Sequence, residues 1–246
     1  MRPLVVLPTY NEALNIAEVL TRVRAAVPDA EILVVDDGSP DGTAELAEEL
    51  GAQLDRIDIL RRPEKAGLGS AYRDGFRIGL ERGLDVMVEM DSDLQHDPAA
   101  LPSLLAAIDD GADLVIGSRY VRGGSIPEWR WHRRLLSRWG NRYAAALLKL
   151  GVRDSTGGYR VYRATVLKAI DLDAVRADGY GFQIEMTYAV ARAGGKIVEV
   201  PIAFTDRLRG TSKMSGRIVV EAMVLVTWWG MRDRVLRPVR RLFTRA

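Results

Sequence analysis

Cysteine is absent from this chain of 246 residues, and histidine occurs only twice. The missing cysteines exclude a disulfide framework and a thiolate metal site, and they are consistent with a reducing compartment such as the cytoplasm. Long hydrophobic runs are missing as well. The N-terminal run 4–7 is too short for the core of a signal peptide. The run 218–231 is interrupted by Glu221 and is shorter than the roughly 20 apolar residues of a membrane-spanning helix.

Positive charge is concentrated in two segments, although the net charge is only +2. Segment 122–142 holds six arginines and one glutamate, and segment 232–246 holds six arginines and one aspartate. This distribution favours an anionic partner, which could be a membrane surface, a phosphorylated substrate or nucleic acid; ordinary solvated faces are the alternative. Nucleic acid is disfavoured because the basic residues are not interleaved with aromatic ones on a recognisable binding motif.

The end of the chain has the pattern of a membrane-interfacial segment. Trp228 and Trp229 precede the arginines of the tail. Aromatic rings at headgroup level and cations toward anionic lipid are typical of an interfacial helix. Residues 217–246 are therefore predicted to form an amphipathic helix and a basic tail at the cytoplasmic face of a membrane, the alternative being a core helix.

Short runs rich in valine and isoleucine alternate with segments of helical length and periodicity. The expected strands are 4–7, 31–35, 57–60, 86–90 and 114–117. The expected helices between them are 13–27, 43–50, 70–81 and 99–109. This alternation predicts an α/β protein with a mainly parallel central sheet covered by helices on both faces. Two further helices, near 143–150 and 182–193, and a strand at 197–204 are expected to complete a site on the same sheet. Residues 1–216 would thus form one domain.

Two of the expected strands end in carboxylates, in VVDDGS (34–39) and VMVEMDSDLQHDP (86–98). Ligands bind at the carboxyl ends of strands in open parallel sheets. If the chain stays extended, Asp91 and Asp93 point to the same side. With the amide oxygen of Gln95 they form a ligand set that suits Mg²⁺ or Mn²⁺. Asp-x-Asp pairs are common in turns, so it is the position after a buried strand that favours a metal site.

Seven segments follow one another in an order that makes a family resemblance specific. They are LPTYNE (7–12), VVDDGSPDGT (34–43), GLGSAYRDG (67–75), MDSDLQHDP (90–98), GSRY (117–120), DSTGGYRVYR (154–163) and VPIAFTDRLRGTSKM (200–214). Together they resemble the dolichol- or polyprenol-phosphate mannose synthases, which are inverting family-2 glycosyltransferases of the Rossmann-like GT-A fold. The resemblance extends to about residue 216. It implies metal-dependent transfer of mannose from GDP-mannose to a polyprenyl (dolichyl-type) phosphate, with inversion.

The resemblance also implies roles for individual residues. The positions that match the family's guanosine site are Pro8, Tyr10, Glu12, Val35 and Asp37. The positions that match its diphosphate and metal site are Met90, Asp91, Ser92, Asp93 and Gln95. Those that match side chains gripping the phosphates of donor or acceptor are Arg119, Arg133, Arg207 and Lys213. Ser92 departs from the family, in which alanine is commoner, and should point away from the metal.

Two further carboxylates belong to family motifs. Asp154 and Glu185 would either line the sugar or acceptor site or be, respectively, a turn aspartate and a helix-face charge. The candidate catalytic set is therefore Asp91, Asp93, Arg119, Asp154 and Glu185. His96 and His132 are interpreted as capping or surface residues.

The implied reaction requires positively charged groups to hold its substrates and does not require a general base. A lipid phosphate is already ionised at neutral pH, so its oxygen can attack without a general base. Arginine side chains suit the task of holding two anionic substrates together. Two alternatives stay open: a polyprenyl-phosphate glucosyltransferase of the same family, and a nucleotide-binding regulatory module without transfer activity. A membrane-protein partner would be compatible with the mannosyltransferase and with the glucosyltransferase.

Overall fold

The computed structural model describes residues 1–205 and 216–243, and within the last helix it describes the side chains of residues 220–233. Seven strands form one sheet in the order β3-β2-β1-β4-β6-β5-β7. They are β1 (Pro3–Thr9), β2 (Glu31–Asp36), β3 (Ile57–Arg61), β4 (Val86–Glu89), β5 (Leu114–Ser118), β6 (Arg160–Arg163) and β7 (Ile197–Pro201). All pairs are parallel except those of β6, which runs antiparallel to β4 and β5. The predicted mainly parallel sheet is confirmed.

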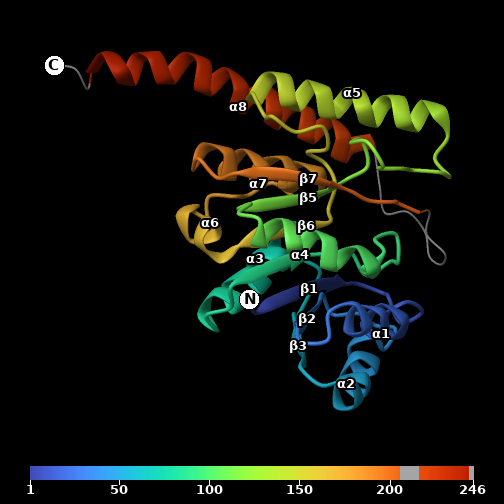
Figure 1. The fold of residues 1–246 in the computed structure, drawn as a ribbon. Helices are drawn as coiled ribbons and strands as arrows, with labels where there is room; N and C mark the ends of the chain where they lie inside the picture. Colours follow the sequence, from blue (N-terminus) through green and yellow to red (C-terminus); the bar gives the residue numbers. More distant parts are fainter. Residues whose placement is uncertain (206–215, 244–246) are drawn as a thin grey trace.

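Helices cover both faces of this sheet (Figure 1). One face carries α1 (Ile16–Ala26), α2 (Thr43–Leu54) and α4 (Leu101–Asp109), the last preceded by the 3₁₀ turn η1 (Pro98–Ala100). The other face carries α3 (Leu68–Glu81), α5 (Trp131–Leu148), α6 (Ala164–Ala169), α7 (Gly179–Arg192) and α8 (Gly216–Phe243). In Figure 1, α5 and α8 lie side by side on the outer edge of this layer.

The strand sequences follow from this double cover. Along β1, Leu4 and Val6 pack with the α3 side, whereas Val5 and Leu7 pack with the α1 side. Because successive side chains alternate between faces, a strand that is covered on both sides must be apolar at every position. β3 lies at the edge of the sheet and is only half-buried, so the expectation of complete burial is wrong for this strand.

The second half of the chain differs more from the sequence-based expectation. β6 and α6 were not predicted; α5 begins at Trp131, well before the expected 143. β6 is short and contains two arginines, Arg160 and Arg163, so its sequence lacks the apolar run of the other strands. It nevertheless lies between β4 and β5 and brings the preceding DSTGG loop to the end of the sheet where the acidic segments lie.

The last helix is amphipathic in the described part of the chain. Ala222, Val226 and Trp229 belong to the core shared with α5 and α7, whereas Val224 and Trp228 are more than half exposed. Of the two tryptophans predicted at a membrane interface, Trp228 is available and Trp229 is buried. Across the described residues, no helix combines the length and the apolar character that crossing a bilayer requires.

Candidate active site

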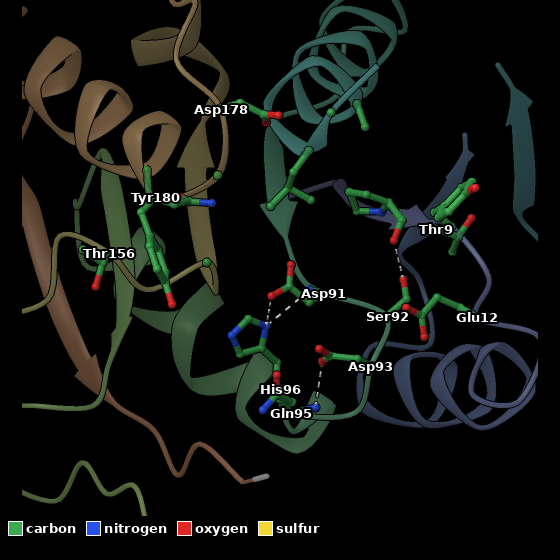
Figure 2. Close-up of a pocket in the computed structure, with 18 of the residues that line it drawn as sticks. Thr9, Glu12, Asp91, Ser92, Asp93, Gln95, His96, Thr156, Asp178 and Tyr180 are labelled. Carbon is green, nitrogen blue, oxygen red and sulfur yellow. Dashed lines mark hydrogen bonds and ion pairs between the residues drawn. The ribbon is translucent and has the colours of Figure 1, made fainter. Parts of the chain in front are cut away.

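A cavity of about 410 Å³ opens at the carboxyl ends of β1, β2, β4 and β5. Most of the predicted site residues line it, namely Pro8, Tyr10, Glu12, Asp37, Asp91, Ser92, Asp93, Gln95, Arg119 and Arg133. Figure 2 shows two sides of this space, with Thr9, Glu12 and Ser92 on one side and Thr156 and Tyr180 on the other. We call these sides the strand-end wall (residues 8–12, 37 and 91–95) and the α7 wall (residues 119, 156, 158, 180 and 183).

Among the predicted residues that the structure describes, four do not line the cavity. Val35 and Met90 are completely buried strand-end side chains that pack in the core behind it. Asp154 and Glu185 accept hydrogen bonds from residues beside the cavity. Arg207 and Lys213 lie outside the described residues.

The predicted nucleoside end of the strand-end wall is held by hydrogen bonds between loops. The Thr9 hydroxyl donates to Asp36 at 2.8 Å, and the Glu12 backbone N–H donates to the Thr43 hydroxyl at 3.0 Å. The Lys65 ammonium lies 4.5 Å from the centre of the Tyr10 ring, a distance typical of a cation–π contact. These contacts fix the positions of Tyr10 and Glu12 at the mouth of the cavity.

Asp37 lies deeper in the same wall, with its side chain only 8% exposed and 3.2 Å from the Arg62 guanidinium. Burial raises the pKa of Asp37 above its ordinary value, and the charge of Arg62 only partly offsets this effect. An ionisable group whose pKa is displaced in this way at a cavity is a candidate for ligand recognition.

Asp91 and Asp93 reach the same cavity (Figure 2), although the predicted reason is wrong. β4 ends at Glu89, and the segment that follows is bent: Leu94 has a φ of +64°. Asp91 Oδ1 accepts a hydrogen bond from the Tyr72 hydroxyl at 3.2 Å, and Asp93 Oδ1 accepts one from the Gln95 N–H at 3.1 Å. A bent segment after β4, rather than a continued strand, therefore carries both carboxylates to the cavity.

The other side chains of this segment have definite orientations. The Ser92 hydroxyl donates to the Pro8 carbonyl at 3.0 Å. Ser92 therefore ties the segment 91–95, which we call the acidic loop, to β1. Gln95 Nε2 donates to the Thr205 carbonyl at 3.1 Å, and the amide oxygen is the only atom of this side chain that can serve as a cation ligand. Within the described residues, no group of three or more His, Cys, Asp or Glu side chains could hold a metal.

This ligand set nevertheless fits the predicted ion. Two carboxylates and one amide oxygen are hard oxygen donors. Mg²⁺ is usually bound through one or two carboxylates and completes its shell with water and substrate phosphates. Three protein ligands would leave the other coordination positions of the ion to water and to the phosphates of the substrate.

His96 holds the acidic loop in place through a hydrogen bond and was not predicted from the sequence to be a site residue. It is only 2% exposed, stacks on Tyr159 and accepts the Asp91 N–H at Nδ1 over 3.2 Å. Burial lowers the pKa of His96 to about 4, so the ring is neutral at physiological pH, with its proton on Nε2. The predicted surface position is wrong for His96, whose ring instead caps the Asp91 N–H inside the protein, whereas His132 is exposed as predicted.

Arg119 on the α7 wall is paired with Asp154. Its Nε and Nη2 each donate to one carboxylate oxygen at 2.7 Å, and its backbone N–H donates at 3.0 Å. Burial alone would raise the pKa of Asp154, but the charge and hydrogen bonds of Arg119 outweigh it and lower that pKa. The carboxylate is fully buried, so it positions Arg119 rather than facing a substrate.

Aromatic rings surround the same guanidinium. Tyr120, Trp129 and Phe204 lie 5.5–5.6 Å from it, and Arg133 stacks on Trp129 at 3.8 Å. Arg133 is only partly buried. Arg119 and Arg133 therefore form the cationic part of the cavity.

Glu185 and the α7 wall account for the remaining features. Glu185 accepts the N–H groups of Arg176 and Ala177, which fixes the loop leading into α7. Several lining residues were not predicted: Lys65, Trp129, Thr156, Gly158, Asp178, Tyr180, Gln183 and Glu221. Most belong to quoted motifs or to the start of α7, but only the antiparallel placement of β6 brings them to the cavity.

Comparison with known proteins identifies the family to which the chain belongs. The model of the family described as glycosyl transferase family 2 matches residues 4–171. A polyprenol monophosphomannose synthase of Mycolicibacterium smegmatis is 53% identical over 237 residues, which are 96% of this chain and 89% of that protein. An undecaprenyl-phosphate mannosyltransferase of Micrococcus luteus is 53% identical over 234 residues, which are 95% of this chain and 96% of that protein.

The fold is also found among solved structures. The mannosyltransferase PcManGT from Pyrobaculum calidifontis, in complex with GDP-Man and Mn²⁺, superposes with a TM-score of 0.65 at 19% identity. The match covers 94% of this chain and 64% of that one. At this identity the likeness bears on the fold alone, and it agrees with the sheet and helix layers described above.

Proposed function

The chain belongs to glycosyl transferase family 2, and we propose that it transfers mannose from GDP-mannose to a polyprenyl phosphate with inversion at the anomeric carbon. The observation that carries this proposal is the 53% identity, over nearly the whole chain, with a polyprenol monophosphomannose synthase. A shared fold alone would not support a substrate, because one fold hosts many activities. Ten of the residues that the resemblance implies also line one cavity, which supports the same reaction.

The donor would lie along the strand-end wall. Tyr10, Glu12 and Asp37 would contact the nucleoside, and the acidic loop from Asp91 to Gln95 would lie beside the diphosphate; all of them except Leu94 line the cavity. Two carboxylates next to a diphosphate would repel it, so the arrangement calls for a cation between them. Asp91, Asp93 and Gln95 would hold Mg²⁺ or Mn²⁺ there. When bound, such an ion offsets the charge that develops on the leaving diphosphate.

The acceptor phosphate would lie toward Arg119 and Arg133. Asp154 keeps the Arg119 guanidinium in a fixed plane, which suits recognition of a phosphate. Neither Asp154 nor Glu185 lines the cavity, which supports a mechanism in which the ionised phosphate attacks without a general base. The residues of this wall orient the two anionic substrates, and orientation alone can supply a large part of a rate enhancement.

Turnover assays test the proposal directly. The purified chain would be incubated with GDP-mannose, a short polyprenyl phosphate and Mg²⁺ or Mn²⁺. Mass spectrometry should detect mannosylphosphoryl polyprenol, and NMR should show the inverted anomer. Transfer from UDP-glucose instead of GDP-mannose would favour the glucosyltransferase alternative. Nucleotide-sugar binding without any transfer to lipid would favour a regulatory module.

Two exposed apolar stripes support a peripheral position at the cytoplasmic membrane face. Trp131, Leu135 and Trp139 recur along α5 at intervals of one helical turn, and all are about half exposed or more. Val224 and Trp228 form a second stripe on the adjacent α8. Glu221 of α8 and Arg133 of α5 line the cavity, so both stripes begin beside the place where a lipid phosphate would enter. Arginines of the tail would add attraction to anionic lipid.

Vesicle binding tests this placement. Leu135→Ser combined with Trp228→Ser should weaken sedimentation with anionic vesicles and lower turnover of a long-chain acceptor, because both side chains would insert into the interface. The matched control is Leu46→Ser, which removes an exposed leucine from α2 at the opposite end of the molecule (Figure 1). Equal vesicle binding by the two variants would contradict the placement. Loss of binding in the control would show that the assay reports general hydrophobicity.

A further inference from the structure

Gln183 is a buried cavity residue to which no role has yet been assigned. It lies in the first turns of α7 and lines the cavity with only 2% of its surface exposed. Neither its amide oxygen nor its amide nitrogen makes a hydrogen bond of ordinary geometry with the residues that the structure describes, although the amide lies close enough to Glu89 to act on the pKa of that carboxyl group. Buried polar groups in folded proteins nearly always have partners, so an exception at a ligand cavity calls for a functional explanation.

The backbone of the same residue is firmly held. The Gln183 carbonyl accepts hydrogen bonds from Arg160 at 2.7 Å and from the Thr187 hydroxyl at 2.8 Å. Arg160 is itself completely buried and donates to the carbonyls of Ser155 and Gly157 as well. α7 and the DSTGG loop are thereby locked together, and the unpartnered amide is not the result of a loosely packed helix.

The side-chain amide of Gln183 and the acidic loop both lie next to Gly158. A Cβ atom on Gly158 would lie 3.5 Å from Gln183 Nε2, 3.5 Å from Asp91 Oδ2 and 3.7 Å from His96 Cε1. Three polar side chains of the two walls therefore converge on one point, which glycine leaves open. A donor whose diphosphate lies at Asp91 would carry its sugar close to this point.

The chemistry of the amide narrows the choice of ligand. A carboxamide offers two N–H donors and one acceptor oxygen. A phosphate can only accept and would leave the oxygen unpaired, and a metal ion would leave the N–H groups unpaired. A hydroxyl group both donates and accepts, so neighbouring hydroxyls of a sugar ring can satisfy both ends of the side chain.

The competing role is structural. Glu89 of β4 is completely buried nearby, and burial raises its pKa to about 8, although Arg160 and the Gln183 side chain act to lower it. In that role the amide would serve mainly to solvate the Glu89 carboxyl group. Its replacement would then destabilise the fold and leave sugar preference unchanged.

We propose that Gln183 hydrogen-bonds ring hydroxyls of the sugar carried by the nucleotide donor and thereby contributes to the choice of sugar. This role rests on the proposed transferase function and adds a contact from the α7 wall to those of the acidic loop. A site that pairs its buried polar groups with a substrate hydroxyl discriminates strongly against analogues that lack the hydroxyl.

Gln183→Leu tests the proposal, because leucine has a similar size and no polar atoms. The ligand-free variant should be as stable to thermal unfolding as the wild type or more stable, since a buried group without a partner is removed. Binding of GDP should change by less than about twofold, whereas kcat/KM for GDP-mannose should fall about 10- to 100-fold. Tyr188→Phe is the matched control on the same helix: its hydroxyl donates to Asp233 of α8, away from the cavity.

Deoxy donors identify the contact. GDP-mannose analogues that lack one ring hydroxyl at a time should be poor substrates of the wild type. For the hydroxyl that Gln183 contacts, the variant should show little further loss, because the two deletions remove the same hydrogen bond. Independent, multiplicative losses for every hydroxyl would overturn the proposal, as would a destabilised variant with unchanged sugar preference.

A failure of the proposed transferase function can be distinguished from a failure of the proposed role of Gln183. If the wild type does not turn over GDP-mannose, the comparison of wild type and Gln183→Leu is made by calorimetry with whichever nucleotide sugar binds, GDP-mannose or UDP-glucose. A nucleotide sugar that loses affinity in the variant while its nucleotide diphosphate does not would support the sugar contact. Equal losses for both would overturn it.

Discussion

The two walls of the cavity hold their charges in different ways. On the α7 wall, Arg119 is clamped by the fully buried Asp154. On the strand-end wall, Asp91 and Asp93 accept hydrogen bonds from a tyrosine hydroxyl and a backbone N–H, and the neutral ring of His96 supports the loop. Asp91 also keeps about a third of its side chain exposed.

One wall thus contains a buried ion pair, whereas the other presents carboxylates to the cavity in which a charged ligand would bind. A buried ion pair with several hydrogen bonds keeps its geometry, and its charges balance without substrate. The carboxylates of Asp91 and Asp93 reach the cavity, and their oxygens are the kind of ligand that a divalent cation prefers. Variants of the Arg119–Asp154 pair should therefore affect folding, and variants of Asp91 and Asp93 should affect binding and turnover. The predictions below test this division.

Asp93→Asn should have the largest effect on activity and almost none on the fold. Loss of one charged metal ligand should lower kcat/KM for mannosyl transfer by about 10³-fold, because the leaving diphosphate loses several kcal/mol of stabilisation. The melting temperature of the metal-free protein should change little. Asp97→Asn is the control from the same loop: Asp97 does not line the cavity and caps η1 by accepting the Ala99 N–H.

The control should keep both its activity and nearly all of its stability, because the side-chain oxygen of asparagine can still accept the Ala99 N–H. Normal turnover by Asp93→Asn, or by the wild type in excess chelator, would contradict the metal site. Strong unfolding of Asp93→Asn would contradict the division between the walls.

Asp154→Asn should have the opposite profile. Its loss leaves the buried charge of Arg119 without a counter-ion, which should lower the free energy of unfolding by about 3–5 kcal/mol in denaturant titrations. The double variant Arg119→Met/Asp154→Leu should recover much of that stability without recovering activity, since it removes both charges. A double variant as unstable as Asp154→Asn would show that the pair is not the source of the loss.

The pH dependence of stability should differ in sign between the walls. The pKa of Asp154 is lowered in the folded protein, so its contribution is present above the ordinary value of 3.8 and is lost as the pH falls through the folded value. The pKa of Asp37 is raised by burial, so stability should decrease as the pH rises from 3.8 through the folded value. Unfolding free energies of Asp154→Asn and Asp37→Asn, measured against the wild type from about pH 3 to about pH 6, should therefore diverge in opposite directions. Parallel curves would contradict this contrast.

Most of the strand-end wall was predictable from the sequence. Its residues follow buried strands directly, so the apolar runs 4–7, 31–35 and 86–90 already place Tyr10, Asp37 and Asp91 at one edge of a parallel sheet. Local pattern is sufficient where the chemistry lies within a few residues of a strand end.

The α7 wall was less predictable because its contacts are made by residues far apart in the chain. The pairing of Arg119 with Asp154 depends on β6 entering the sheet antiparallel between β4 and β5. The short strand around Arg160 has no apolar run that would announce it. The importance of His96 was missed for a similar reason: only its packing against Tyr159 and Phe204 shows that it is buried.

Gly158→Ala should have a small effect on the fold and tests the space between the walls. The added Cβ would make ordinary contacts of 3.5 Å with Asp91 Oδ2 and Gln183 Nε2, and the backbone of Gly158 is not left-handed. The free energy of unfolding should therefore change by no more than about 1 kcal/mol, and the loss of a flexible glycine can even raise it. The methyl group would occupy the point where the two walls converge, so kcat/KM for GDP-mannose should fall about tenfold, while binding of GDP should persist because the nucleotide lies along the other wall. A variant that is equally stable and equally active would place the sugar elsewhere in the cavity, and a strongly destabilised one would show that the walls already touch at this point in the free protein.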